Sequence, residues 1–119
     1  STTDLCYFAS QGDSASVRRL LEEGVSPDFK DEEGQTGLHF AADRGHFEIM
    51  TLLIERKASL NVREDSGQTC LHYASAAGNL EACRLLKAAG ADLSAADEDG
   101  ATPALLADSD EIKALLALT

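Results

Sequence analysis

Apolar and polar positions alternate along residues 34–66 in a pattern that predicts two helices joined by a tight turn. A first, short apolar stripe consists of Leu38, Ala41 and Ala42, which lie at helical spacing and are mostly small. A second stripe holds larger side chains: Phe47, Ile49, Met50, Leu52, Leu53 and Ile54. The polar, turn-prone stretch 61–67 follows. The pattern therefore predicts a unit of helix, turn, helix and projecting loop.

Polar residues and glycines mark the ends of these predicted helices. Thr36 precedes the first stripe, where its hydroxyl can accept from the backbone N–H groups that a helix start leaves free. Gly45 follows that stripe, as expected of a residue that takes positive φ to end a helix. Lys57 and Ala58 are expected to close the second helix, and Gly37 should slightly loosen the start of the first.

The same unit recurs every 33 residues. The segment GQTGLH at 34–39 returns as GQTCLH at 67–72, and a weaker copy, GATPAL, occupies 100–105. In the second full unit, Thr69 is the expected cap and Gly78 the expected turn. A fixed period of this size is typical of a stacked array, in which a unit cannot bury its apolar face alone. Such arrays usually present a surface and seldom carry a catalytic pocket.

The two end units depart from the pattern, as the terminal units of a stacked array do. Arg18 and Arg19 stand where the next unit has Thr51 and Leu52, so the first unit has a more polar outer helix. The last unit lacks three residues and its glycine turn, and Ser109 is expected to cap its final helix. The expected organisation is a single domain, 1–119, with a capping unit at 1–33, full units at 34–66 and 67–99, and a truncated capping unit at 100–119.

Across the chain, Gly-x-Thr-x-Leu-His is followed by Ala-Ala or Ala-Ser, Gly, Leu-Leu and Gly-Ala-Asp at the same spacing. This combination resembles the ankyrin repeat, with four units that cover essentially the whole chain. The resemblance implies an all-α ankyrin-repeat solenoid of about four stacked helix-turn-helix units with projecting β-hairpin-like loops. The sequence departs from the family at Gly37 and Cys70, where proline is favoured, at Lys57 and Ser59, and at Leu105, which replaces histidine.

Within ankyrin proteins, five segments resemble the C-terminal ankyrin region of acyl-CoA-binding-domain-containing proteins. They are Asp31–Gly34, Ala42–His46, Gly67–Thr69, Leu71–Ala76 and Asp97–Gly100. In that family a separate helical domain, N-terminal to the repeats, holds the acyl-CoA, and no such segment occurs in this sequence. Acyl-CoA would therefore bind only through a separate domain of a parent protein. The chain begins at Ser1 rather than Met, so we expect a fragment of a larger protein.

Composition and charge narrow the possible partners. The formal net charge is −11, with 21 Asp and Glu residues against 10 Lys and Arg. Nucleic acids and anionic membranes need clustered positive charge, so we expect neither to bind. A basic partner would be attracted, although acidity alone would also keep the array soluble. No apolar run approaches the roughly 18 residues that cross a bilayer, so no membrane insertion is expected.

Three cysteines, Cys6, Cys70 and Cys83, give an odd number and no C-x-x-C spacing. A small secreted chain would show an even, paired set. We therefore expect buried, unreactive thiols in a reducing compartment, which means an intracellular protein of the cytoplasm and, as a second location, the nucleus.

The histidines are the strongest candidates for chemistry, but their positions favour a structural role. His39 and His72 each follow a threonine by three residues, so each ring is expected to bond back to the threonine hydroxyl and forward to a neighbouring loop. They would lie roughly 10 Å apart, too far to share a metal ion. His46 is expected to cap or brace the turn at Gly45. Cys70 and His72, at i and i+2, point to different sides of a helix.

The acidic segment Asp97–Gly100 has the character of a calcium loop, but its spacing lacks the bidentate glutamate at the twelfth position of an EF-hand. A polar loop tip is the better interpretation. We therefore predict no catalytic residue, no cofactor and no metal site, and we expect that the chain is not an enzyme.

The resemblance implies that the loop tips and the exposed sides of the short first helices form a concave protein-binding face. The residues expected to bind a partner are Lys30, Glu32, Glu33, Gln35, Asp43, Arg44, Arg63, Asp65, Ser66, Gln68, Ala76, Ala77, Glu98 and Asp99, with Ala96 and Ala101 beside them. The alternative interpretation is that many of these residues are merely solvated. The predicted function is a monomeric, non-catalytic protein–protein interaction module. The alternative function is a regulatory or targeting arm of an intracellular acyl-CoA-binding protein of lipid metabolism.

Overall fold

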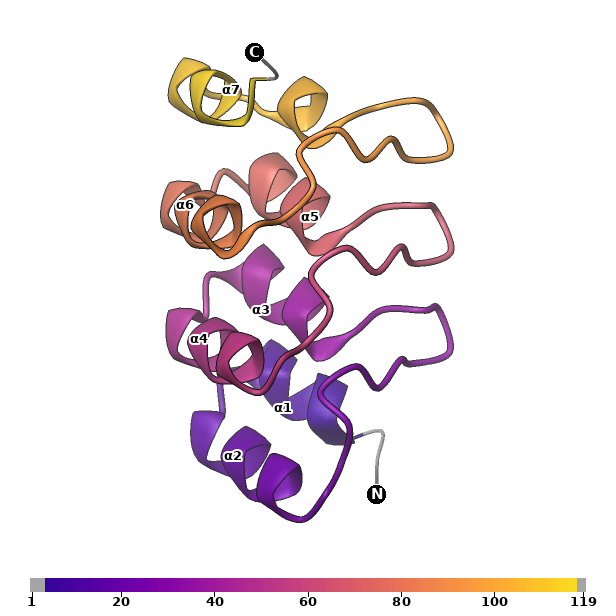
Figure 1. Cartoon of the computed structure of the whole chain (residues 1–119), viewed down its shortest axis with the longest axis vertical. Helices are drawn as coiled ribbons and strands as arrows, with labels where there is room; N and C mark the ends of the chain where they lie inside the picture. The colour runs from indigo at the N-terminus through magenta and orange to yellow at the C-terminus, as the bar shows by residue number, and fades with distance from the viewer. Residues whose placement is uncertain (1–3, 118–119) are drawn as a thin grey trace.

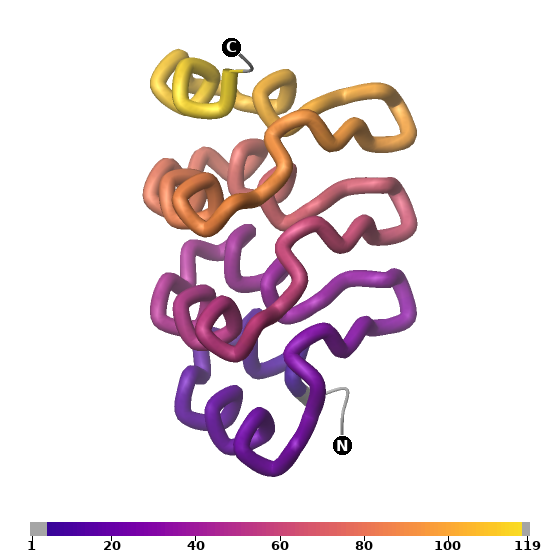
Figure 2. The backbone as a smooth tube through the Cα atoms, in the orientation of Figure 1, coloured from indigo at the N-terminus to yellow at the C-terminus, as the bar shows by residue number. Residues whose placement is uncertain are grey.

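The computed structural model describes residues 4–117, and its helices form two stacked layers (Figure 1). The elements are α1 (Asp4–Gln11), α2 (Ser14–Glu22), α3 (Gly37–Arg44), α4 (Phe47–Glu55), α5 (Cys70–Ala77), α6 (Leu80–Ala89), the 3-10 helix η1 (Pro103–Leu106) and α7 (Asp110–Leu116). One layer holds α1, α3, α5 and η1, and the other holds α2, α4, α6 and α7. The stack measures 41 × 25 × 21 Å, and the loops between units project from one side (Figure 2).

This architecture confirms the predicted all-α solenoid. Residues 4–117 contain no β-strand, only an isolated antiparallel bridge between Lys30 and Thr36. The projecting loops are therefore tight turns with hairpin-like legs. Within the same residues, no helix is both long enough and apolar enough to cross a bilayer.

The helix starts follow the predicted capping chemistry. The Thr36 and Thr69 side chains accept from the backbone N–H groups three residues later, and their own backbone is extended. Ser109 caps α7, since its hydroxyl accepts from the Ile112 N–H at 3.0 Å. All three predicted caps are confirmed, because capping depends on residues within one turn of the cap.

The turns between helices use left-handed backbone, as expected for Gly45 (φ 71°) and Gly78 (φ 76°). Lys57 is the one non-glycine residue with positive φ in the described chain, at 67°. It stands where Gly90 lies one unit later, and α4 already ends at Glu55. Its side chain makes this conformation cost about 1–2 kcal/mol relative to a right-handed one.

The core is a continuous column of aliphatic residues between the two layers. Leu5, Leu38 and Leu71 occupy equivalent positions on α1, α3 and α5, and each is at most 1% exposed. On the second layer, Leu53 and Leu86 are completely buried at equivalent positions. Small residues between them let the helices approach closely, so each unit buries its apolar face against the next.

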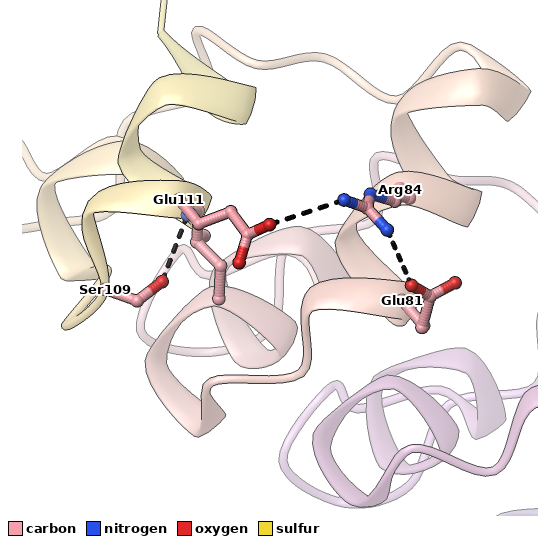
Figure 3. A network of polar contacts seen from close by, with 5 residues as sticks. Glu81, Arg84, Ser109 and Glu111 are labelled. Carbon is pink, nitrogen blue, oxygen red and sulfur yellow. Dashed lines mark hydrogen bonds and ion pairs between the residues drawn. The ribbon is translucent and has the colours of Figure 1, made fainter.

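The last unit differs most from the others. Its first helix is the single 3-10 turn η1, and the backbone of Ala107 directly after it is extended. The three missing residues and the missing glycine turn explain this, because the chain must leave the helix early to reach α7. Arg84 on α6 forms exposed ion pairs with Glu111 on α7 at 3.5 Å and with Glu81 at 2.8 Å (Figure 3).

Candidate functional site

Each loop tip is closed by a carboxylate that accepts hydrogen bonds from its own backbone. Asp31 Oδ1 accepts from the N–H groups of Glu33 and Gln35, both at 2.9 Å. Glu64 and Asp97, which follow at the 33-residue spacing, do the same on the second and third tips. These three residues were not among the predicted site residues. An acidic residue at the same position of each unit was the signal in the sequence that could have identified them.

Backbone hydrogen bonds join neighbouring tips. The Asp65 N–H donates to the Glu33 carbonyl, and the Glu98 N–H donates to the Ser66 carbonyl, both at 3.0 Å. Arg63 also donates from its guanidinium to the Ala96 carbonyl. The three tips therefore form one ordered edge rather than three independent loops.

Gly67 lies where two tips pack most closely, so Gly67→Ala should destabilise the array by about 1–3 kcal/mol more than Gly78→Ala. Both glycines have positive φ, so both substitutions incur similar backbone strain. A Cβ on Gly67 would lie 3.0 Å from the Glu98 nitrogen, whereas a Cβ on Gly78 would meet nothing within 4 Å. Urea unfolding followed by circular dichroism measures both losses. Equal losses would contradict the close packing of the tips.

The two repeat histidines connect the tips to the first-helix layer. His39 Nδ1 accepts from the Thr36 N–H at 3.1 Å, so the proton lies on Nε2, which donates to the Gln68 carbonyl at 3.0 Å. His72 makes the equivalent bonds to Thr69 and to the next tip. Burial lowers the pKa of His39 below its ordinary value, against a smaller opposing effect of the Gln68 carbonyl. The predicted structural role of both histidines is confirmed.

Tyr73 on α5 connects two tips through its hydroxyl, which the sequence pattern did not indicate. The hydroxyl accepts from Gln35 Nε2 at 2.7 Å and donates to Glu64 Oε2 at 2.9 Å. Its ring stands edge-on to His39, with centroids 4.9 Å apart. Burial is the main cause that raises the pKa of Tyr73 to about 12, so the hydroxyl stays protonated and can donate.

Two of the predicted partner-binding residues are half-buried as well as bonded within the array. Gln35 and Gln68 are half-buried, and the Gln68 amide donates to Asp97 Oδ2 at 3.1 Å. This bond, together with the Ala101 N–H, lowers the pKa of Asp97 below its ordinary value. Both glutamines therefore hold neighbouring tips together and are less available to a partner than the sequence pattern suggested.

The other twelve predicted residues are exposed and lie on one face, which we call the tip face: the loop tips and the exposed sides of α1, α3 and α5. They are Lys30, Glu32, Glu33, Asp43, Arg44, Arg63, Asp65, Ser66, Ala76, Ala77, Glu98 and Asp99. Arg44 also reaches the preceding unit, where it donates to the Ser10 carbonyl at 3.4 Å. Ala96 and Ala101 beside them are half-buried.

The His46 ring contacts the preceding unit rather than the turn at Gly45, which it was expected to cap or brace. It stands at the start of α4 without a side-chain capping bond, and its Nε2 lies 3.3 Å from the Ser10 carbonyl of the preceding unit. The ring therefore braces the turn of the preceding unit around Gly12. Asn79 has the equivalent position one unit later and donates to the carbonyls of Ala42 and Asp43.

The cysteines are buried, as predicted. Burial raises the pKa of Cys6 and Cys83 to about 11 and that of Cys70 to about 12, so all three thiols remain protonated and weakly nucleophilic. Cys70 Sγ donates to the Leu60 carbonyl. In the described part of the chain, His, Cys, Asp and Glu side chains form no group of three or more that could hold a metal ion.

A hollow of about 280 Å³ lies on the second helix layer, away from the tip face. Its lining comes from α2 and α4: Arg18, Phe47, Glu48, Thr51, Leu52 and Glu55. Phe47 is 45% exposed at this place, although its stripe predicted a core position. The lining carries charges of both signs and no pair of reactive groups.

Comparison with known proteins agrees with this geometry. A family model described as ankyrin repeats (three copies) matches residues 5–97. The chain belongs to the ankyrin-repeat family. Ankyrin repeats generally mediate protein–protein interactions and are typically non-catalytic.

Individual relatives match shorter stretches. Ankyrin repeat domain-containing protein 46 of Danio rerio is 42% identical over 48 residues, which are 40% of this chain and 21% of that protein. The Rattus norvegicus protein of the same name is 49% identical over 37 residues, 31% of this chain and 16% of that protein. Potassium channel SKOR of Arabidopsis thaliana is 42% identical over 45 residues, 38% of this chain and 5% of the channel. The chain therefore spans at most 21% of the length of these curated relatives.

Proposed function

We propose that this ankyrin array is a non-catalytic module that holds a protein partner on the tip face. The observation that carries the proposal is the ordered edge of the tips, where Asp65 and Glu98 bond to the preceding tip through their backbone at 3.0 Å while their side chains stay exposed. An ordered backbone with exposed side chains binds well, because little conformational entropy is lost when a partner docks.

The differences between units support the same face. Thr36 and His39 have identical counterparts one unit later, because these residues maintain the stack. Asp43 and Arg44, in contrast, correspond to Ala76 and Ala77, and all four are exposed. Side chains that vary where the structure does not need them provide the chemical differences that a specific partner requires.

The alternative function, a regulatory or targeting arm of an acyl-CoA-binding protein, stays a prediction that rests on the five segments resembling acyl-CoA-binding-domain-containing proteins. The names of the relatives from Danio rerio, Rattus norvegicus and Arabidopsis thaliana do not mention acyl-CoA. In that alternative, too, the array would act by binding a protein, and acyl-CoA would be held by a separate domain. A test of protein binding therefore addresses the activity that both functions share.

Uncharged, bulkier side chains in the middle of the tip face test the proposal without changing the charge of that face. Replacing Ala76 and Ala77 with glutamine should weaken partner binding at least about tenfold, because each longer side chain would prevent close contact over α5. The matched control replaces Ala88 and Ala89, which are exposed at the end of α6 in the second layer. Glutamine is a good helix former at all four positions.

Partners captured by the immobilised chain would be purified and identified. Calorimetry would then measure their affinity for the original chain, for the Ala76 and Ala77 variant on α5 and for the Ala88 and Ala89 variant on α6. The proposal requires a loss of affinity for the α5 variant and an unchanged affinity for the α6 variant. If both variants bind the partner as the original chain does, the tip face is not the binding site.

A further inference from the structure

The exposed side of the first-helix layer carries a stripe of aromatic rings. Tyr7, Phe40 and Tyr73 stand at equivalent positions on α1, α3 and α5, separated by 33 residues each. Tyr7 is 58% exposed, and the other two rings are half-buried. The Tyr73 hydroxyl reaches Glu64 on the second tip at 2.9 Å, so this aromatic stripe runs beside the tips.

A row of carboxylates follows the edge of the tips next to the stripe. Glu32, Asp65 and Glu98 are exposed and again occupy equivalent positions. Within residues 4–117, none of these three carboxylates has a hydrogen-bond or ion-pair partner, in contrast to the bonded Asp31, Glu64 and Asp97. These three exposed carboxylates are therefore not bonded within the described residues, and we call them the carboxylate row.

The stripe and the row share one spacing along the stack. Each tip contributes two backbone legs, such as Asp31 and Gln35, whose N–H and carbonyl bond at 2.8 Å. Neighbouring legs lie about 4.8 Å apart, so equivalent residues on successive tips lie about 10 Å apart. Four units in a 41 Å stack give the same distance of about 10 Å per unit. Packed helices, such as α1, α3 and α5, are also about 8–10 Å apart.

We propose that the tip face binds an extended, basic segment of a protein partner in which lysine or arginine recurs at every third residue. A polyproline II helix is extended and returns to the same face every three residues, after about 9.3 Å. Every third side chain would therefore meet the next carboxylate of the row. The inference rests on the function proposed above and specifies its partner.

The two surfaces suit the two parts of a basic side chain. The charged head pairs with the carboxylate row, and a guanidinium or an alkyl stem packs on the rings of Tyr7, Phe40 and Tyr73. The net charge of −11 attracts such a segment and repels an acidic one. Lys30 and Arg63 are also exposed on the tips and oppose a basic segment, although the Arg63 guanidinium donates to the Ala96 carbonyl. The tips 30–35, 63–68 and 96–101 carry eight Asp and Glu residues against these two cations, so negative charge dominates.

Two labelled twelve-residue peptides test the spacing, with binding to the intact chain followed by fluorescence anisotropy at about 0.15 M salt. One repeats arginine, proline and serine four times, and its isomer has the same composition with the four arginines contiguous. We expect the periodic peptide to bind about tenfold more tightly, since three exposed charge pairs together contribute about that factor. Replacing Tyr7 with alanine should weaken its binding about threefold by removing one ring.

Neutralising the carboxylate row should remove the preference between the peptides. The variant carries Glu32→Gln, Asp65→Asn and Glu98→Gln. Its matched control carries Glu22→Gln, Glu55→Gln and Asp110→Asn, which change the net charge equally at exposed positions of the second layer. Circular dichroism verifies that both variants remain helical.

Three results would overturn the inference: equal affinity of the original chain for the two peptides, an equal loss of affinity in the row variant and its control, or a helical row variant that keeps the preference for the periodic peptide. Failure of the proposed function looks different. If glutamines at Ala76 and Ala77 prevent binding of a purified partner while the two peptides bind with equal affinity, the tip face binds proteins but does not select basic residues at every third position. If the glutamines leave partner binding unchanged, the proposed function itself is wrong.

Discussion

Replacing Leu71 with alanine should lower the free energy of unfolding by about 3–5 kcal/mol, the largest effect expected of a single substitution here. Leu71 is completely buried on α5, which packs against α3, α6 and η1. The shorter side chain would leave a cavity in the middle of the core column, where the capped and bonded helices around it cannot collapse to fill it. Urea unfolding followed by far-UV circular dichroism measures the loss.

Leu105→Ala is the matched control for this prediction. The same atoms are removed, but Leu105 is 71% exposed on η1, so the expected loss is below about 0.5 kcal/mol. Similar losses in the two variants would contradict the burial pattern described here. A changed slope of the unfolding free energy against urea would instead indicate that the end units unfold separately from the centre.

Replacing His39 with leucine should lower the free energy of unfolding by about 2–3 kcal/mol at neutral pH. The ring is 1% exposed and accepts from the Thr36 N–H, which would lose its buried partner. The His39 bond to the Gln68 carbonyl, which joins α3 to the next tip, would be lost as well. His46→Gln, which removes a half-buried histidine with one 3.3 Å contact, should cost less than half as much.

The lowered pKa of His39 also predicts how the free energy of unfolding changes with pH. Burial holds its pKa in the folded chain below the ordinary value of 6.5, so folding favours the neutral ring. As the pH falls below about 6.5, the unfolded chain takes up a proton that the folded chain resists, and stability decreases. His39→Leu should show a smaller decrease in this range. An unchanged decrease would show that His39 is not responsible.

Three aspartate carboxylates affect stability in a lower range of pH. Hydrogen bonds from Ser16, Ser94 and Gln68, respectively, lower the pKa of Asp13, Asp92 and Asp97 below the ordinary value of 3.8. Their contribution is complete above that value and decreases as the pH falls through the lowered values. Measurements between about pH 5 and 7.5 therefore isolate the histidine effect from the carboxylate effect.

Much of the fold could be predicted because its rules are local and repeated. Thr36 caps α3, Gly45 ends it, and His39 bonds back to the cap, all within a few residues of chain. The 33-residue period then extended each local interpretation to the next unit. The 3-10 turn η1 was not predicted, because its shape depends on how a shortened unit reaches α7 over the existing stack.

The sequence by itself determined the helix caps and glycine turns of the repeated units, most of the buried core, the structural role of the histidines and the side of the array that projects its loops. Only the tertiary structure decided which residues on that side are available. Gln35 bonds to Tyr73 across 38 positions and Gln68 to Asp97 across 29, and such bonds depend on how successive units stack. A periodic pattern specifies what each unit is, whereas the distance between units determines which of its polar side chains reach a neighbour and which remain for a partner.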